Sequence, residues 1–107
     1  MGEKDFERVL TGLERMSEPT YREYQRHIRR YKQWIENERD KSIFEGDVLD
    51  LRKYVNHLLD EGYSASSVNV WKAAMSNFYT EANSISQRIG ANIEKNYANE
   101  INLSEWS

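Results

Sequence analysis

The chain has 107 residues, enough for one domain with a single modest core, and a formal net charge of −3 at pH 7. Hydrophobic residues make up 38% of the chain and aromatic residues 12%, which is enough to bury large side chains and argues against a disordered chain. The sequence contains no cysteine, so disulfides, thiolate nucleophiles and thiolate metal sites are excluded.

The first half of the chain shows helical periodicity in two segments. Apolar residues recur at helical spacing from Phe6 to Leu13 and predict a first helix over about residues 3–15. A second helix is predicted to begin at Ser17, a natural N-cap residue ahead of Pro19, and to run to about residue 36. The buried side of this second helix is predicted to be a stripe of apolar and aromatic residues: Tyr21, Tyr24, Ile28, Tyr31 and Ile35.

The middle of the chain predicts two further helices. Residues 37–46 are polar and are predicted to form a loop. A third helix follows over about residues 47–61, with Asp47 as its N-cap and Gly62 at the left-handed position that ends it. A fourth helix opens at Ser64, and its core face consists of Val68, Trp71, Met75, Phe78, Tyr79 and Ala82.

The end of the chain is less regular. Ile85, Ile89 and Ile93 recur every four residues and predict one more short helix, broken near Gly90. Residues 96–107 are predicted to be a tail or linker. Together these elements predict an all-α fold: a single orthogonal bundle of four to five helices within residues 1–95.

Charge is unevenly distributed along the chain, and the basic part lies on the second predicted helix. Residues 20–33 hold five basic side chains against one acid, whereas residues 36–61 hold eight acids against four bases. At about 100° per residue, Arg22, Arg26, Arg29 and Arg30 fall within about 100° of one another, opposite the apolar stripe. Because arginine favours bidentate contact with phosphate or guanine, we expect this face to bind an anion or nucleic acid, with an ordinary solvated face as the alternative.

The fourth predicted helix has an exposed face of a different kind. Short polar or small side chains and one lysine share this face, with Ser66 near its edge: Asn69, Lys72, Ala73, Ser76 and Thr80. No carboxylate follows until Glu81. Such a face can approach a surface closely, and its Asn and Lys side chains can reach base edges or phosphates. A neutral solvent face is the alternative interpretation.

The second and fourth predicted helices begin in the same way, with Ser17-x-x-Thr20 and Ser64-x-x-Ser67. The start of a helix offers unpaired backbone N–H groups and a partial positive charge, which suit a phosphate group. Ordinary helix capping explains the same two motifs equally well.

The order of these motifs resembles a known family. Ser17-x-x-Thr20-Tyr21 is followed by Asp50-Leu51-Arg52, then by Gly62-Tyr63-Ser64-x-x-Ser67-Val68-Asn69, and then by Phe78-Tyr79. Over about residues 15–82 this order is similar to the core-binding (SAM-like) domain of the tyrosine recombinases, the phage integrase family. The resemblance implies a bundle of four or five helices that forms one half of a C-shaped clamp around DNA, with the second and fourth helices in or beside the major groove.

The resemblance also implies which residues face DNA. By resemblance the DNA-facing residues are Thr20, Arg22, Arg26, Arg29, Ser66, Asn69 and Lys72. Arg30 and Ser76 are added because they share the same helix faces. Duplex DNA is the implied partner, and other recombinase subunits bound to the same DNA are further candidates.

The resemblance does not extend to catalysis. The catalytic domain of the family supplies an arginine, a His-x-x-Arg motif, another basic residue and a tyrosine nucleophile, and we expect no catalytic residue in this chain. His27-x-x-Arg30 lies inside the second predicted helix, where it reflects helical periodicity. The chain reads Asn96-Tyr97-Ala98 where the family often has Asn-Pro, and it ends at Ser107, about where a catalytic domain would begin. We therefore expect a non-enzymatic fragment of a larger recombinase.

Other site classes find no support in the sequence. Two histidines 30 positions apart make a zinc site improbable, and scattered glycines form no phosphate-binding loop, so we expect no metal, cofactor or small-molecule substrate. No apolar run approaches the ~18 residues of a membrane helix, so a cytoplasmic protein without membrane contact is the default expectation. Two alternative functions remain open: a helical protein-interaction module that docks through Trp34 and Ile35 or the isoleucine helix, and a stand-alone helix-turn-helix regulator.

Overall fold

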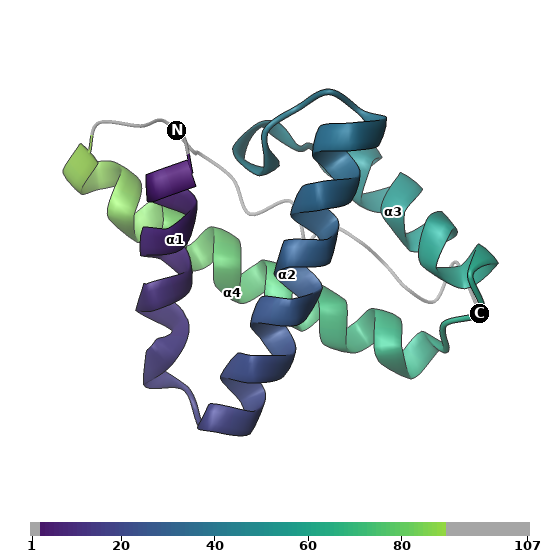
Figure 1. Ribbon diagram of the computed structural model, residues 1–107, viewed down its shortest axis with the longest axis horizontal. Coiled ribbons are helices and arrows are strands. Elements are labelled where there is room, and N and C mark those ends of the chain that lie inside the picture. The colour runs from purple at the N-terminus through teal and green to yellow at the C-terminus, as the bar shows by residue number, and fades with distance from the viewer. Residues whose placement is uncertain (1–2, 90–107) are drawn as a thin grey trace.

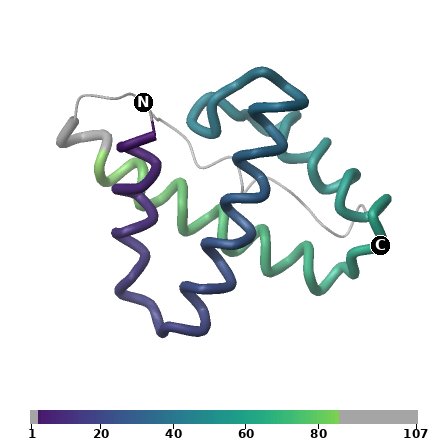
Figure 2. Tube along the Cα trace, in the orientation of Figure 1, coloured from purple at the N-terminus to yellow at the C-terminus, as the bar shows by residue number. Residues whose placement is uncertain are grey.

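The computed structural model describes residues 3–89, and within that range it contains helices and no strand. The α-helices are α1 (Glu3–Gly12), α2 (Glu18–Glu38), α3 (Val48–Asp60) and α4 (Ala65–Ile89), and two short 3-10 turns are η1 (Leu13–Arg15) and η2 (Ile43–Glu45). Figure 1 shows α1 and α2 joined at their lower ends, with α4 crossing behind both and α3 beside the upper part of α2. The same path is visible in the trace of Figure 2. The prediction of an all-α bundle of four to five helices is confirmed.

The core is organised around α4, which contacts α1, α2 and α3. Phe78 of α4 lies with its ring centroid 5.7 Å from that of Phe6 in α1, and Trp71 lies 5.7 Å from Tyr31 in α2. The predicted core face of α4 is fully buried, and so is the central part of the predicted α2 stripe: Val68, Trp71, Met75, Phe78, Tyr79, Ala82, Ile28, Tyr31 and Ile35. Burying one side of α2 leaves its opposite side exposed along most of the helix.

Capping residues fix where α3 begins and ends, which sets the position of the turn into α4. The Asp47 carboxylate accepts a hydrogen bond from the Asp50 backbone N–H, and the Asp50 carboxylate accepts one from the Asp47 N–H, so the two form a capping box. At the other end Gly62 has φ of 92°, a conformation that suits glycine, and the next residue, Tyr63, donates its N–H to the Leu58 carbonyl. Both predicted caps are therefore confirmed.

The Asp50 carboxylate also fastens the segment between α2 and α3. Asp50 is 0% exposed and accepts hydrogen bonds from Arg39 Nε and Lys41 Nζ, each at 2.8 Å. Burial raises the pKa of this carboxyl group, but the hydrogen bonds from Lys41, Arg39 and the Asp47 N–H outweigh burial and lower its pKa to about 2. The carboxylate therefore remains charged and holds the connecting segment on α3.

The structure differs from the sequence-based prediction in several places. The last turn of the first predicted helix is the 3-10 turn η1, and η2 lies within the predicted loop. Ile85 belongs to α4, which continues to Ile89, so no separate helix begins there. The predicted end of that helix at Ile93 and the predicted tail at 96–107 lie outside the described residues.

Candidate nucleic-acid interface

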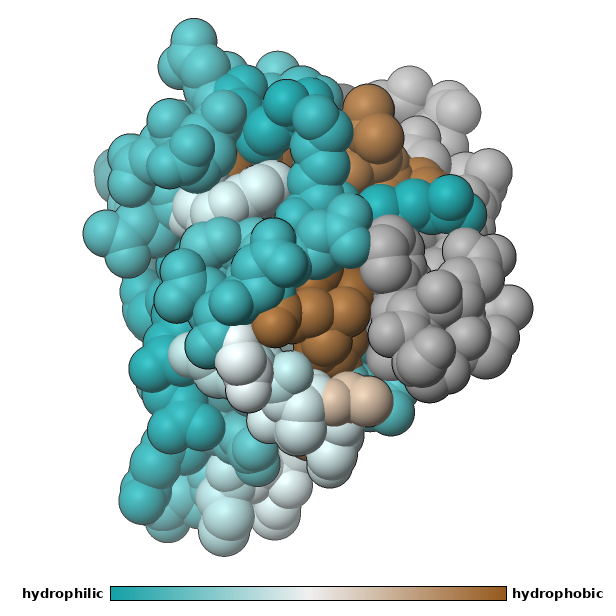
Figure 3. Space-filling model, turned by 90° about the vertical axis from the view of Figure 1, so that its right-hand side faces the viewer, coloured by the Kyte–Doolittle hydropathy of each residue, from teal (hydrophilic) through white to brown (hydrophobic). Residues whose placement is uncertain are grey.

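The exposed side of α2 carries three arginines at intervals of four residues. Arg22, Arg26 and Arg30 are all exposed, whereas Ile28, on the opposite side of the helix, is completely buried. The spacing aligns the arginines along one side of the helix because residues four apart lie above one another. In Figure 3, hydrophilic residues cover the left-hand part of the view, which is the part nearest the viewer in Figure 1, where α2 lies. We call Arg22, Arg26 and Arg30 the arginine row.

Arg22 forms an ion pair within its own helix. Its Nη2 lies 2.6 Å from Glu18 Oε1, and the two side chains are 73% and 80% exposed. Such a solvent-exposed pair between residues four apart contributes about 0.3–0.5 kcal/mol. Arg22 can therefore exchange this carboxylate for another anion at little cost in stability.

Arg26 is the most available arginine of the row. It is exposed and forms no hydrogen bond or ion pair with any residue in 3–85. It borders a surface hollow formed by the first turns of α2, together with Pro19, Arg22, Glu23 and Gln25. Glu23 is the one carboxylate that lines this hollow, and Glu18 pairs with Arg22, so Arg26 supplies the positive charge of the hollow that no described carboxylate pairs with.

Arg29 lies in a different environment from the arginine row. Its Nη1 and Nη2 donate to the two carboxylate oxygens of Glu7 in α1 at 3.0 and 3.2 Å, and its Nε donates to Gln25 Oε1 at 2.8 Å. The guanidinium also lies over the Phe6 ring, 5.6 Å from its centroid. The sequence predicted four arginines standing clear of the protein together, and for Arg29 this is wrong because the Glu7 side chain of α1 reaches that flank of α2.

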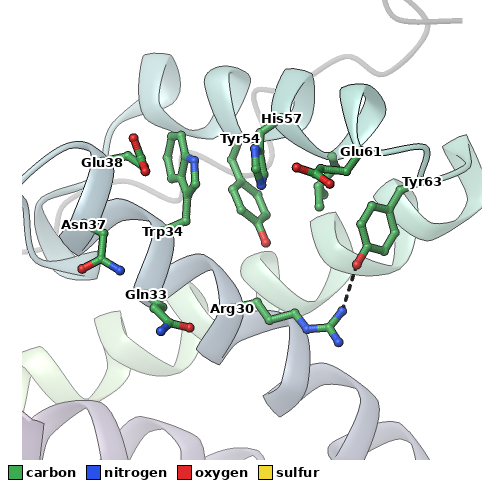
Figure 4. A pocket seen from close by; sticks show the side chains of 10 residues that line it. Arg30, Gln33, Trp34, Asn37, Glu38, Tyr54, His57, Glu61 and Tyr63 are labelled. Carbon is green, nitrogen blue, oxygen red and sulfur yellow. Dashed lines mark hydrogen bonds between the residues drawn. The ribbon is translucent and has the colours of Figure 1, made fainter.

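Arg30 extends to the opposite flank of α2, toward the turn between α3 and α4. Its Nη1 donates a hydrogen bond to the Tyr63 hydroxyl at 3.1 Å (Figure 4). Arg30 and Tyr63 lie at one end of a groove between α2 and α3, whose wall also carries Trp34, Tyr54 and His57. Burial raises the pKa of Tyr54 to about 12, with a smaller contribution from Tyr63 in the same direction and an opposing one from Arg30. The Tyr54 phenol therefore stays neutral.

The predicted polar face of α4 is solvent-accessible over its first turns. Ser66 and Asn69 are exposed, and Lys72 and Ser76 are half-buried. Lys72 forms no ion pair or hydrogen bond with another described residue. Because α4 begins two residues after Tyr63, the Arg30 flank of α2 is the one that adjoins the start of this helix.

The two serine motifs adopt related but unequal geometries. Ser64 caps α4: its hydroxyl accepts from the Ser67 backbone N–H at 3.2 Å and donates to the Ser67 hydroxyl. Ser17 occupies the N-cap position of α2 without a side-chain bond to the backbone, and its hydroxyl donates to the half-buried Thr20 hydroxyl at 2.9 Å. Capping explains the motif fully at Ser64 and only in part at Ser17.

Two residues that shape the surface were missed by the sequence analysis. Glu7 neutralises Arg29, and Tyr63 engages Arg30. Neither contact is visible in the sequence because each joins two residues at least 22 positions apart. Within residues 3–89 no group of three or more His, Asp or Glu side chains could hold a metal ion, and no helix has the length and apolar character needed to span a membrane.

Comparison with known proteins identifies a family. The family model for the N-terminal SAM-like domain of phage integrase matches residues 4–84. The match includes the arginine row and all the predicted interface residues of α4. No curated protein and no solved structure shows a significant match to the chain.

Proposed function

The chain belongs to the family of phage integrase N-terminal SAM-like domains, as the order of its motifs predicted, and on this premise we propose that it binds duplex DNA through the exposed faces of α2 and α4. The arginine row supplies the main contact with the phosphate backbone. The domain itself is non-catalytic, and it serves as one half of a clamp within a recombinase whose catalytic residues lie in another domain.

The length and charge of the arginine row suit a DNA strand. From Arg22 to Arg30 the row spans about 12 Å at about 1.5 Å per residue. Each strand of B-form DNA advances about 3.4 Å along the duplex axis per phosphate, so about 12 Å along that axis corresponds to about three to four phosphate steps. Guanidinium groups bind phosphate oxygens in bidentate geometry, so each contact fixes the orientation of the phosphate group in addition to neutralising its charge.

One observation carries the proposal: Arg26, at the centre of the row, is exposed and free of any carboxylate partner among residues 3–89. Arg39, by contrast, is paired with the buried Asp50. Arg22 has only the exposed Glu18 as partner, and Arg30 has the neutral Tyr63. All three charges are thus accessible to a phosphate group.

The face of α4 has a complementary role. Asn69 is exposed and can pair with a base edge, and Lys72 can reach a phosphate. Ser66 and Ser76 have short side chains that allow the helix to approach the DNA closely. Thr20 and Arg29 border the arginine row on α2; of these, Arg29 contributes fully only when it is released from Glu7.

Titration of a fluorescently labelled duplex with the 107-residue chain tests the proposal. The wild-type chain is expected to bind modestly, and its affinity should fall steeply with salt, by about 0.9 log units per log unit of salt for each neutralised phosphate. Arg26→Ala should weaken binding to all duplexes and lower the salt slope by about one. The matched control is Arg52→Ala, which removes an exposed arginine of α3 outside the proposed surface.

Two results would contradict the proposal. If Arg26→Ala and Arg52→Ala weaken binding equally, the chain binds DNA through its charge in general and not through α2. If the wild-type chain shows no salt-dependent binding to duplex DNA at low salt, the proposed function is wrong.

A further inference from the structure

Tyr63 is an unusual residue for the turn between two helices. Tyr63 is 37% exposed, and it is one of the two large hydrophobic residues that remain exposed in the described part of the chain. Gly62, with φ of 92°, turns the chain immediately before it, and the backbone N–H of Tyr63 is tied to the Leu58 carbonyl. The position of the ring is therefore set by the turn that ends α3.

The Tyr63 hydroxyl is oriented by an arginine from another helix. Arg30 Nη1 donates to Tyr63 Oη at 3.1 Å across the gap between α2 and the turn (Figure 4). In this bond the phenol oxygen acts as acceptor, so its own O–H proton remains available. That proton has no acceptor among residues 3–85, and the guanidinium keeps further N–H donors for a second partner.

We propose that Arg30 and Tyr63 form a single binding unit for one phosphate group of the DNA backbone. Tyr63 Oη donates a hydrogen bond to a phosphate oxygen, and the Arg30 guanidinium supplies the positive charge and a second donor. The inference rests on the proposed function, and it adds to the DNA surface a residue of the α3–α4 turn. The unit lies where the arginine row of α2 adjoins the start of α4, so one phosphate would connect the two helices' contacts.

The charges around the pair are mixed. Glu38 lines the groove beside Trp34, and its negative charge opposes the entry of a phosphate group between α2 and α3, whereas Glu61 lies beside Tyr63, so the charge of Arg30 has to outweigh that of Glu61. At the exposed pair, Arg30 forms no ion pair with a described carboxylate. Hydrogen bonds to charged groups are shorter and stronger than neutral ones, so a phosphate is the partner that gains most from two donors.

Three variants in the duplex titration test the unit. Tyr63→Phe removes only the hydroxyl and should weaken binding about fivefold, the usual effect of one hydrogen bond, while leaving the salt slope unchanged because the hydroxyl carries no charge. Arg30→Ala should weaken binding and lower the slope by about one. In the double variant the loss should stay within about twofold of that in Arg30→Ala alone, because the two side chains act on the same phosphate.

The matched control is Tyr21→Phe, which removes the hydroxyl of a tyrosine near Glu7 and Arg29, on the α1 side of α2, and should not change affinity. Thermal unfolding followed by circular dichroism checks that each variant folds. Unchanged affinity in Tyr63→Phe, with Arg26→Ala impaired, overturns the unit and leaves the proposed function standing. Additive losses in the double variant, or a reduced salt slope in Tyr63→Phe, also overturn it. No duplex binding by the wild-type chain overturns both proposals.

Discussion

The ion pair between Glu7 and Arg29 leads to a prediction that runs against the usual direction of mutational effects: a substitution in α1 should strengthen DNA binding. Glu7 holds Arg29 through two hydrogen bonds, at 3.0 and 3.2 Å, on the flank of the arginine row. Glu7→Gln removes the negative charge, so the guanidinium can turn toward the DNA. The variant therefore gains one phosphate contact that the wild-type chain makes only by breaking this pair.

The expected size of the effect follows from the exposure of the pair and from counterion release. The Arg29 and Glu7 side chains are 46% and 49% exposed, so losing the pair should cost at most about 1 kcal/mol of stability. One added phosphate contact makes the salt slope steeper by about 0.9. Between 200 and 50 mM salt, the ratio of variant to wild-type affinity should consequently rise by a factor of about 3.5.

Duplex titrations of Glu7→Gln at these two salt concentrations measure both quantities. The control is Glu14→Gln, which removes an exposed carboxylate from η1 without freeing Arg29. If both variants bind DNA more tightly to the same extent, the gain comes from net charge and not from a phosphate contact of Arg29. If Glu7→Gln shows the wild-type slope at unchanged stability, Arg29 does not reach the DNA.

The remaining predictions concern stability and are both measured by chemical denaturation. The pKa of Asp50 falls from 3.8 to about 2 on folding, so its charge contributes about 2 kcal/mol to stability that is present above pH about 4 and is lost as pH falls toward 2. Asp50→Asn should therefore be less stable than the wild type by this amount at pH 7 and equally stable near pH 2. An equal difference in stability at both pH values would contradict the prediction. Gly62→Ala should destabilise the folded chain by about 1 kcal/mol because alanine is strained at φ of 92°. Backbone strain is the whole of this cost, since the added Cβ meets no atom within 4 Å. Unchanged stability would contradict the left-handed cap.

The sequence predicted those features that depend on local pattern. The buried stripe from Ile28 to Ile35 follows from helical spacing, and the caps at Asp47 and Gly62 follow from residue type at a helix end. The recurrence of Ile85, Ile89 and Ile93 predicted a separate short helix, whereas α4 continues through Ile85 to Ile89. No glycine or proline interrupts the helix before Gly90, however, and that is the more reliable signal.

The interface was predictable only in part because its electrostatics depend on tertiary packing. The helical spacing of Arg22, Arg26 and Arg30 is visible in the sequence, but the approach of α1 that brings Glu7 onto Arg29 is not. Tyr63 illustrates the same limit: a cap at Gly62 indicates that the next residue folds back toward the preceding helix. It gives no information that Arg30 of α2 lies within hydrogen-bonding distance there.

The most direct test of the DNA-binding surface is to follow the backbone amide signals of the isotope-labelled chain by NMR while a duplex is added. The largest shifts are expected to cluster on the arginine row, on the turn at Tyr63 and on the first turns of α4, at Ser66 and Asn69. Shifts confined to α1, or to the part of the groove around Trp34 and His57, would contradict the proposed surface.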